Sequence, residues 1–263
     1  MITSDIFAYQ STSVDFLTVT SKDIDGLAAI NDAYKALTSQ MSNYDRMCRV
    51  WRFKGFSGES CGSVRQGLRE DGWAILMVSG GAAHEASKIL EIKDANVTRL
   101  DLQVTVKFEV CQEHYARGVF NLLTTGGVGK TKNVSSRFIT SSSKGETVYI
   151  GSRTSQQMAR IYDKGIESDL APAGFLWRYE VEFKKPLASR VFSTIQASEA
   201  PNLGIPEIVY HWLLKRGVKP TWPISGDAPI VEVAWKAKSL ERTLSWLRTQ
   251  VRPTVLRLLD AGN

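Results

Sequence analysis

Three segments of the chain alternate apolar side chains with acidic, basic or phenolic ones. On their polar positions they carry Asp101, Arg160, Tyr162, Glu180 and Glu182. If each segment is a β-strand, alternate residues point to opposite faces of a sheet. These side chains then converge wherever the three polar faces meet.

Such a convergence has a definite chemistry. Carboxylates bind Mg²⁺ or Mn²⁺ through hard oxygen ligands, and the metal draws charge off a phosphate oxygen. Arg160 and Lys164 can neutralise the charge that builds on the phosphate, while Tyr162 attacks the phosphorus and forms a phosphotyrosine. Because a tyrosine pKa is about 10, its phenoxide leaves readily, so a strand can be cut and rejoined without ATP.

Simpler interpretations of the same residues stay open. An acidic residue that alternates on a strand is often just solvated. Arg178 and Glu180 can form an ordinary surface ion pair, and Tyr162 can be a half-buried packing residue. Composition and alternation alone therefore do not decide between a phosphoryl-transfer site and a solvated strand face.

The segment 124–132 reads TTGGVGKTK, close to the phosphate-binding loop G-x-x-x-x-G-K-[ST]. Thr124 stands where the first glycine belongs, and the preceding segment has the apolar spacing of a helix. A phosphate-binding loop must follow a buried strand and open a helix, so the order is wrong. We favour a basic loop whose Lys130 and Lys132 contact DNA phosphates, and keep an ATPase as a third hypothesis.

The composition favours a nucleic-acid partner in a reducing compartment. The 263 residues carry a net charge of +6, with a pI of about 9.2. The three cysteines lack C-x-x-C spacing and the three histidines lack zinc-site spacing, so we expect reduced thiols and no zinc. No apolar run is long enough to span a bilayer and no secretory signal is visible. We therefore expect a cytoplasmic protein with no membrane partner.

The pattern of elements predicts an α+β fold. Alternating segments predict strands at 14–20, 99–110, 145–152, 157–165 and 175–185, and helical spacing predicts helices at 82–90 and 205–217. Strands with one polar face predict a largely antiparallel, curved central sheet with helices packed on one side. We expect a catalytic domain at 1–225 and a C-terminal helical segment at 226–263 that packs on it or extends from it.

One stretch is more specific than any of these patterns. Residues 147–164 follow the pattern T-x-Y-I-G-S-R-x-S-x-x-x-x-R-I-Y-x-K throughout. With VDFLTVT, GWAILMVSGGAAHE, VTRLDLQV and WRYEVEF in the expected order, the chain resembles the replication initiation factor family. That family comprises rolling-circle initiators of small plasmids and certain filamentous phages, with relaxases of some integrative elements.

The resemblance implies a nickase-ligase that binds an origin, as a single-stranded or hairpin nick site with flanking duplex. The tyrosine of the pattern is Tyr162, which becomes linked to the 5′ phosphate, while a host helicase and polymerase extend the free 3′ end. The resemblance makes Asp101 and Glu180 metal-ligand candidates, with Glu182 beside them. Arg153, Arg160 and Lys164 match basic positions of the pattern, and Arg178 joins the expected DNA contacts. The resemblance also leaves a homodimer open, since related initiators often act as pairs.

The chain departs from the family pattern at one position. Many members carry a second aspartate where Thr105 stands. Either that carboxylate is dispensable, or Glu182 or Asp15 replaces it, or metal binding is weakened. The departure keeps open an alternative function, an origin- or operator-binding protein of the same fold that no longer cuts.

Overall fold

The computed structural model describes nine stretches of the chain: residues 7–22, 40–45, 48–54, 60–67, 74–89, 95–125, 135–142, 145–197 and 201–222. All of them belong to the first of two compact units, Met1–Val231; the second is Glu232–Asn263. The predicted C-terminal helical segment at 226–263 lies outside the described residues, so the expected division of the chain stays a prediction.

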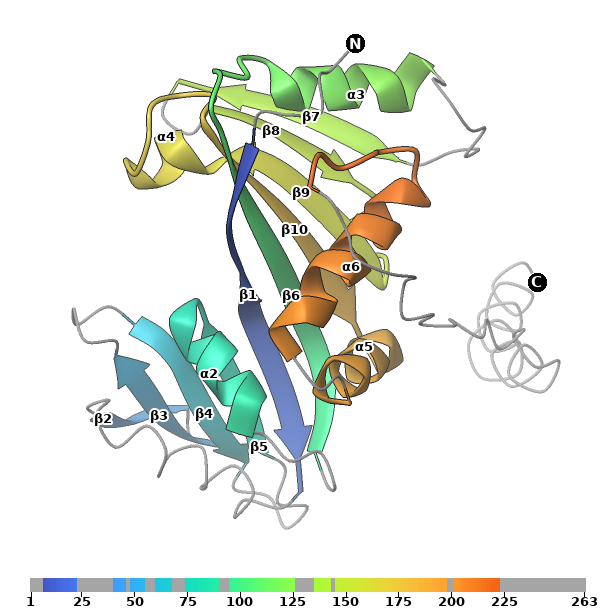
Figure 1. Ribbon diagram of the computed structural model, residues 1–263. Helices are drawn as coiled ribbons and strands as arrows, with labels where there is room; N and C mark the ends of the chain where they lie inside the picture. The colour runs from blue at the N-terminus through green and yellow to red at the C-terminus, as the bar shows by residue number, and fades with distance from the viewer. Residues whose placement is uncertain are drawn as a thin grey trace, which may run out of the picture. The chain divides into compact units, whose positions relative to one another are not determined.

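Among the described residues, ten strands form one sheet in the order β2-β3-β4-β5-β1-β6-β10-β9-β8-β7 (Figure 1). Every pair of neighbours is antiparallel. The strands are β1 (Phe7–Ser21), β2 (Gln40–Asp45), β3 (Cys48–Lys54), β4 (Ser60–Gly67), β5 (Ala74–Ser79), β6 (Ala95–Phe108), β7 (Ser136–Ser141), β8 (Gly145–Ile150), β9 (Gln157–Asp163) and β10 (Leu176–Lys184).

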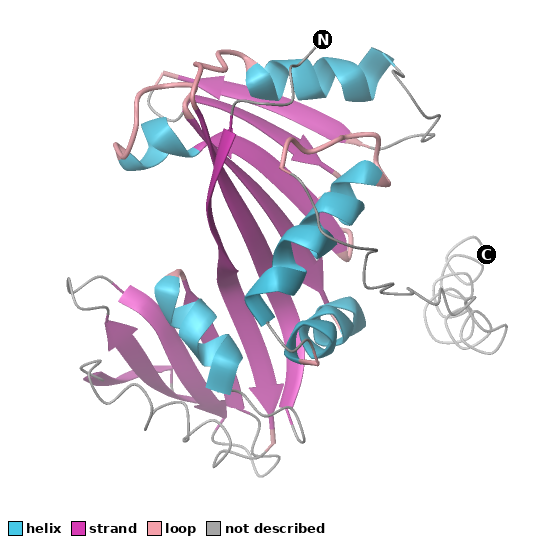
Figure 2. Cartoon of the chain, in the orientation of Figure 1, coloured by secondary structure: helices cyan, strands magenta, loops and turns pink. Residues whose placement is uncertain are grey.

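The longer helices cover one face of this sheet (Figure 2). They are α2 (Gly81–Ile89) on β1 and β5, α3 (Tyr115–Thr125) on β7 and β8, and α5 (Pro186–Gln196) and α6 (Pro201–Leu214) on β6 and β10. A short helix, α4 (Lys164–Ser168), follows β9 directly. The predicted α+β class, with an antiparallel sheet and helices on one side, is confirmed. No helix within these described stretches has the length and apolarity to cross a bilayer.

Strand β6 shows how the alternation builds the core. Leu100, Leu102, Val104 and Val106 are fully buried on the helix-covered face, as their spacing predicted. The polar residues between them are also buried, with Asp101 only 2% exposed. The opposite face is therefore a packed layer of polar side chains rather than a solvated surface.

Irregular pairing bends strand β1 against β6. The register shifts between Tyr9 and Ser11, between Val14 and Phe16, and between Thr18 and Val19. Each shift of this kind adds a local bend and twist, which accounts for the curvature of the sheet.

A tight turn follows β5 and fixes the bulged part of β1. Gly80 has φ of +59°, a left-handed conformation that side-chain-bearing residues rarely adopt. Its N–H donates to the carbonyl of Asp15 at 2.7 Å. This turn thus holds the backbone at Asp15 in place.

Candidate active site on the open face of the sheet

The strand register brings the predicted site residues to one face. Glu182 pairs with Asp101 across β10 and β6, and Glu180 pairs with Arg160 across β10 and β9. Tyr162 lies two residues beyond Arg160 and shares its side of the strand. We call this the open face, because the longer helices α2, α3, α5 and α6 cover the other one.

Asp101 and Glu182 form a carboxylate pair that shares one guanidinium. Arg99 donates to both oxygens of Asp101, from Nε at 3.0 Å and from Nη2 at 2.6 Å. The same Nη2 lies 3.0 Å from Oε2 of Glu182. Lys184 forms a second ion pair with Glu182. The carboxylate pair therefore already holds a cationic group between its two members.

The pKa of Asp101 reflects this crowding. Its pKa is raised from 3.8 to about 6: burial is the largest cause, Arg99 opposes it, and the charges of Glu180 and Glu182 add to it. Burial and like-charged neighbours both disfavour the ionised carboxylate. A further cation at this place would relieve both costs.

Tyr162, Arg160 and Glu180 form the tyrosine site. The phenolic hydroxyl of Tyr162 donates to Oε2 of Glu180 at 3.4 Å, and Arg160 Nη2 donates to Oε1 at 2.6 Å. The Arg160 guanidinium carbon lies 5.1 Å from the centre of the Tyr162 ring. One carboxylate thus contacts both the candidate nucleophile and a candidate phosphate-binding cation.

Electrostatics keep the tyrosine protonated at rest. Burial raises the pKa of Tyr162 well above its ordinary value, and the Glu180 charge raises it further, while Arg178 and Arg160 lower it. Burial also raises the pKa of Glu180 against the opposing charge of Arg160. Any nucleophilic role of Tyr162 therefore needs a proton acceptor and added positive charge.

Thr105, which stands where many family members have an aspartate, belongs to a chain of hydrogen-bonded side chains. Thr105 Oγ1 donates to Gln103 at 2.7 Å and accepts from Arg178 Nε at 3.0 Å. Gln103 in turn donates to the Ser13 hydroxyl at 2.6 Å. Arg178 Nη1 also lies 3.6 Å from a carboxylate oxygen of Asp15. A carboxylate therefore stands close to Thr105, contributed by the β1 bulge.

The predicted basic residues have different surroundings. Lys164, the first residue of α4, pairs with Glu167, whose charge in turn raises the pKa of Tyr162. The guanidinium of the exposed Arg153 lies 5.7 Å from the centre of the Tyr149 ring. Lys130 and Lys132 lie outside the described residues.

The end of β9 is held by a buried cap next to the tyrosine. Asp163 accepts hydrogen bonds from the N–H groups of Ile166 at 3.3 Å and Gly174 at 2.7 Å. A side-chain cap of this kind contributes about 1 kcal/mol to the start of a helix. The chain therefore turns away from the sheet directly after Tyr162, which fixes where the tyrosine stands.

The donor chemistry suits a divalent cation, but the resting geometry does not gather three ligands. Within the described residues, no three His, Cys, Asp or Glu side chains lie close enough to hold one ion together. Asp101 and Glu182 offer hard oxygens and already bind the Arg99 guanidinium between them. The predicted third ligand, Glu180, contacts Arg160 and Tyr162 instead. The carboxylate pair thus fits a cation that takes the place of Arg99.

The sequence analysis did not identify Arg99 as a member of this site, and it named Asp15 only as an alternative ligand. Arg99 has the same strand parity as Asp101, a signal that indicates a shared face. Asp15 reaches the open face only through the bulge between Val14 and Phe16. An irregular pairing of this type has no clear mark in the residue pattern.

The comparisons with known proteins bear on this geometry. Residues 95–209, which span β6 to most of α6, match the family model described as replication initiation factor. The predicted resemblance to replication initiation factors is confirmed over this segment. The segment contains Asp101, Tyr162, Glu180 and Glu182, whereas Asp15 lies outside it.

A solved structure shares the fold of this chain. It is a rolling circle replication initiator protein from Geobacillus stearothermophilus, 16% identical, with a TM-score of 0.56. The similarity covers 82% of this chain and 92% of that one. No curated protein matches the chain.

Proposed function

We propose that the chain initiates rolling-circle replication by nicking and rejoining one strand of origin DNA through Tyr162. The observation that carries the proposal is the contact of Tyr162 with Glu180 beside Arg160, on a face shared with the carboxylate pair. The family match over residues 95–209 supports the same reaction class. The proposal places this activity in the bacterial cytoplasm, with a host helicase and polymerase downstream.

In the proposed first step, the phenolic oxygen of Tyr162 attacks the scissile phosphorus and the bond to the 3′ oxygen breaks. The phenolic proton passes to Glu180, whose carboxylate already accepts the hydrogen bond. The 3′ oxygen leaves and takes up a proton, and the 5′ phosphate stays on the tyrosine. Because the ester energy is retained, attack by a 3′ hydroxyl reverses the step and closes a strand.

Positive side chains favour the charged states of this step. Arg160 faces both the tyrosine ring and Glu180, and Arg178 lowers the pKa of Tyr162. Their charges stabilise the phenolate and the phosphate oxygens as negative charge develops. A Mg²⁺ or Mn²⁺ ion held by Asp101 and Glu182 would draw charge off a phosphate oxygen when bound.

A second candidate function is a DNA-binding protein of the same fold that does not cut. The complete ion pairing of Asp101, Glu180 and Glu182, together with Thr105 in place of an acid, favours it. A nicking assay on supercoiled origin DNA with Mg²⁺ or Mn²⁺ distinguishes the two candidate functions. The first function predicts open circles for the wild type and none for Tyr162→Phe, which still binds. If Tyr162→Phe nicks like the wild type, Tyr162 is not the nucleophile.

A matched control distinguishes chemistry from folding. Tyr210→Phe removes a phenolic hydroxyl on α6, where the ring packs on Trp222 on the helix-covered side. We expect this variant to nick at the wild-type rate. Equal losses in Tyr162→Phe and Tyr210→Phe would assign the effect to stability.

A further inference from the structure

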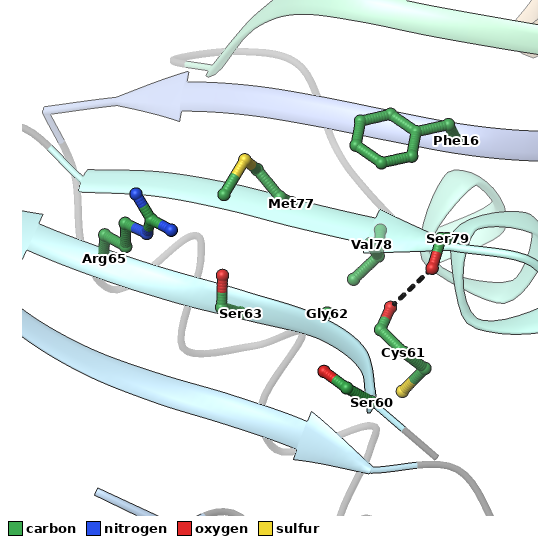
Figure 3. Close-up of a pocket in the computed structure, with 9 residues that line it drawn as sticks. All are labelled: Phe16, Ser60, Cys61, Gly62, Ser63, Arg65, Met77, Val78 and Ser79. Atoms are coloured by element: carbon green, nitrogen blue, oxygen red, sulfur yellow. Dashed lines mark hydrogen bonds between the residues drawn. The ribbon is translucent and has the colours of Figure 1, made fainter. Parts of the chain in front are cut away.

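A hollow on the open face lies next to the carboxylate pair. Its volume is about 290 Å³, and its walls come from β1, β4 and β5 (Figure 3). We call it the Phe16 hollow and define it by six of its lining residues: Phe16, Ser63, Arg65, Met77, Val78 and Ser79.

The strand register joins the Phe16 hollow to the proposed active site. Phe16 pairs with Ser79 on one side and with Asp101 on the other. The Arg99 guanidinium carbon lies 4.3 Å from the centre of the Phe16 ring while the same group binds Asp101. Neighbouring strands lie about 4.8 Å apart, so Ser79 is about 10 Å from Asp101 across the sheet.

The lining combines an apolar surface with a polar edge. The Phe16 ring and the Met77 thioether supply the apolar part, while Ser63 and Ser79 supply hydroxyls. The Ser79 hydroxyl donates to the carbonyl of Cys61 at 3.3 Å, so its oxygen can still accept a bond. This mixture suits a flat heteroaromatic group with polar edges.

Arg65 adds a cation at the margin of the hollow. Its side chain is exposed and stands on the same face of β4 as Ser63 (Figure 3). A guanidinium in this place can contact a phosphate while the attached base enters the hollow. Single-strand binding sites combine these features, a basic groove and side chains against which bases pack.

We infer that the Phe16 hollow binds one unpaired nucleobase of the strand that Tyr162 cuts, a few nucleotides from the scissile phosphate. The inference rests on the proposed function and adds a base-binding subsite to it. The volume lies just below the range of about 300–1,000 Å³ typical of small-molecule pockets, which suits a single base. Phe16 and Arg99 connect the hollow to the carboxylate pair of the proposed active site. The bound base therefore belongs to the DNA strand that lies in that site.

Binding without cleavage tests the inference. The full chain carrying Tyr162→Phe, in the absence of divalent cations, is titrated with fluorescent dT12 and with a 12-mer of the same backbone without bases. We expect dT12 to bind about tenfold more tightly, since each packed base adds measurably to affinity. Adding Phe16→Leu lowers the affinity for dT12 about fivefold and leaves the base-free strand unchanged.

Two further variants keep the outcome decisive. Phe120→Leu makes the same change on α3, on the helix-covered face, and leaves both affinities unchanged. If Phe16→Leu does not fold, Ser63→Leu fills the hollow and lowers only the dT12 affinity. Equal effects on both strands, or no effect, overturn the base subsite. If neither strand binds the Tyr162→Phe protein at all, the proposed function fails together with it.

Discussion

The hydroxyl of Tyr162 and the carboxylate of Glu180 meet across strands β9 and β10, with the hydroxyl donating at 3.4 Å. The contact joins a phenol whose pKa is raised by burial to an acid whose pKa is also raised by burial. The raised pKa of Glu180 makes its carboxylate a stronger proton acceptor, whereas the raised pKa of Tyr162 opposes loss of the phenolic proton, so positive charge near the phenol is also needed.

Replacing Glu180 by glutamine separates its two effects on the tyrosine. The proton acceptor is lost, so nicking falls about 10²- to 10⁴-fold. The negative charge is lost as well, so the pKa of Tyr162 falls, since that charge helps to raise it. Tyrosinate absorbance against pH measures the second effect in the absence of DNA. An unchanged nicking rate in Glu180→Gln removes the carboxylate from the mechanism.

We expect Arg99 to compete with a divalent cation for the carboxylate pair. Its guanidinium binds Asp101 and Glu182 at 2.6 and 3.0 Å. Arg99→Gln removes this charge, so Mn²⁺ binds about tenfold more tightly or better, because a like charge a few ångströms away is lost. Titration calorimetry on the DNA-free protein gives the affinity. Arg137→Gln, the same change on the exposed surface of β7, has no effect. Weaker Mn²⁺ binding in Arg99→Gln contradicts the assignment.

Asp101 makes the metal-free protein less stable as the pH rises. Its pKa in the folded state, about 6, lies above the ordinary 3.8, so the folded state binds the proton more tightly. The resulting stabilisation is complete below pH 3.8 and is lost as the pH rises through 6. Asp101→Asn therefore matches the wild type at low pH and exceeds its free energy of unfolding by about 3 kcal/mol at pH 7.5. Urea unfolding at both pH values tests this; a parallel pH dependence contradicts it.

We expect DNA binding to depend steeply on salt. A single strand held through four phosphate contacts loses about 50-fold in affinity when the salt concentration rises fourfold. Anisotropy titrations of the Tyr162→Phe protein with dT12 at 50 to 200 mM salt measure the slope. A flat dependence argues against a nucleic-acid partner.

The period of a β-strand explains why much of the site could be predicted. Alternation predicts Asp101, Tyr162 and Glu180 each on the polar face of its own strand, and the register brings these three faces together. The same rule fails where a strand ends or bulges. Lys164 continues the parity of Tyr162, but β9 stops at Asp163 and Lys164 begins α4, where it pairs with Glu167.

Asp15 is the converse case. It has the parity of Leu17 and Val19, which are buried under the helices, so simple alternation assigns it to that face. The bulge after Val14 turns it toward Arg178 on the open face instead. Arg178 itself was predicted to contact DNA, and its side chain contacts Thr105 and lies close to Asp15. These contacts of Arg178 are made with residues of other strands, and the residue pattern of one strand does not reveal which residues those are.

Identification of the residue that becomes joined to DNA tests the account most directly. The wild-type protein is incubated with Mn²⁺ and a single-stranded origin oligonucleotide, and the covalent adduct is digested and analysed by mass spectrometry. The account predicts a nucleotide linked through its 5′ phosphate to Tyr162, and no adduct in Tyr162→Phe. An adduct on another residue, or cleavage with no covalent intermediate, would contradict it.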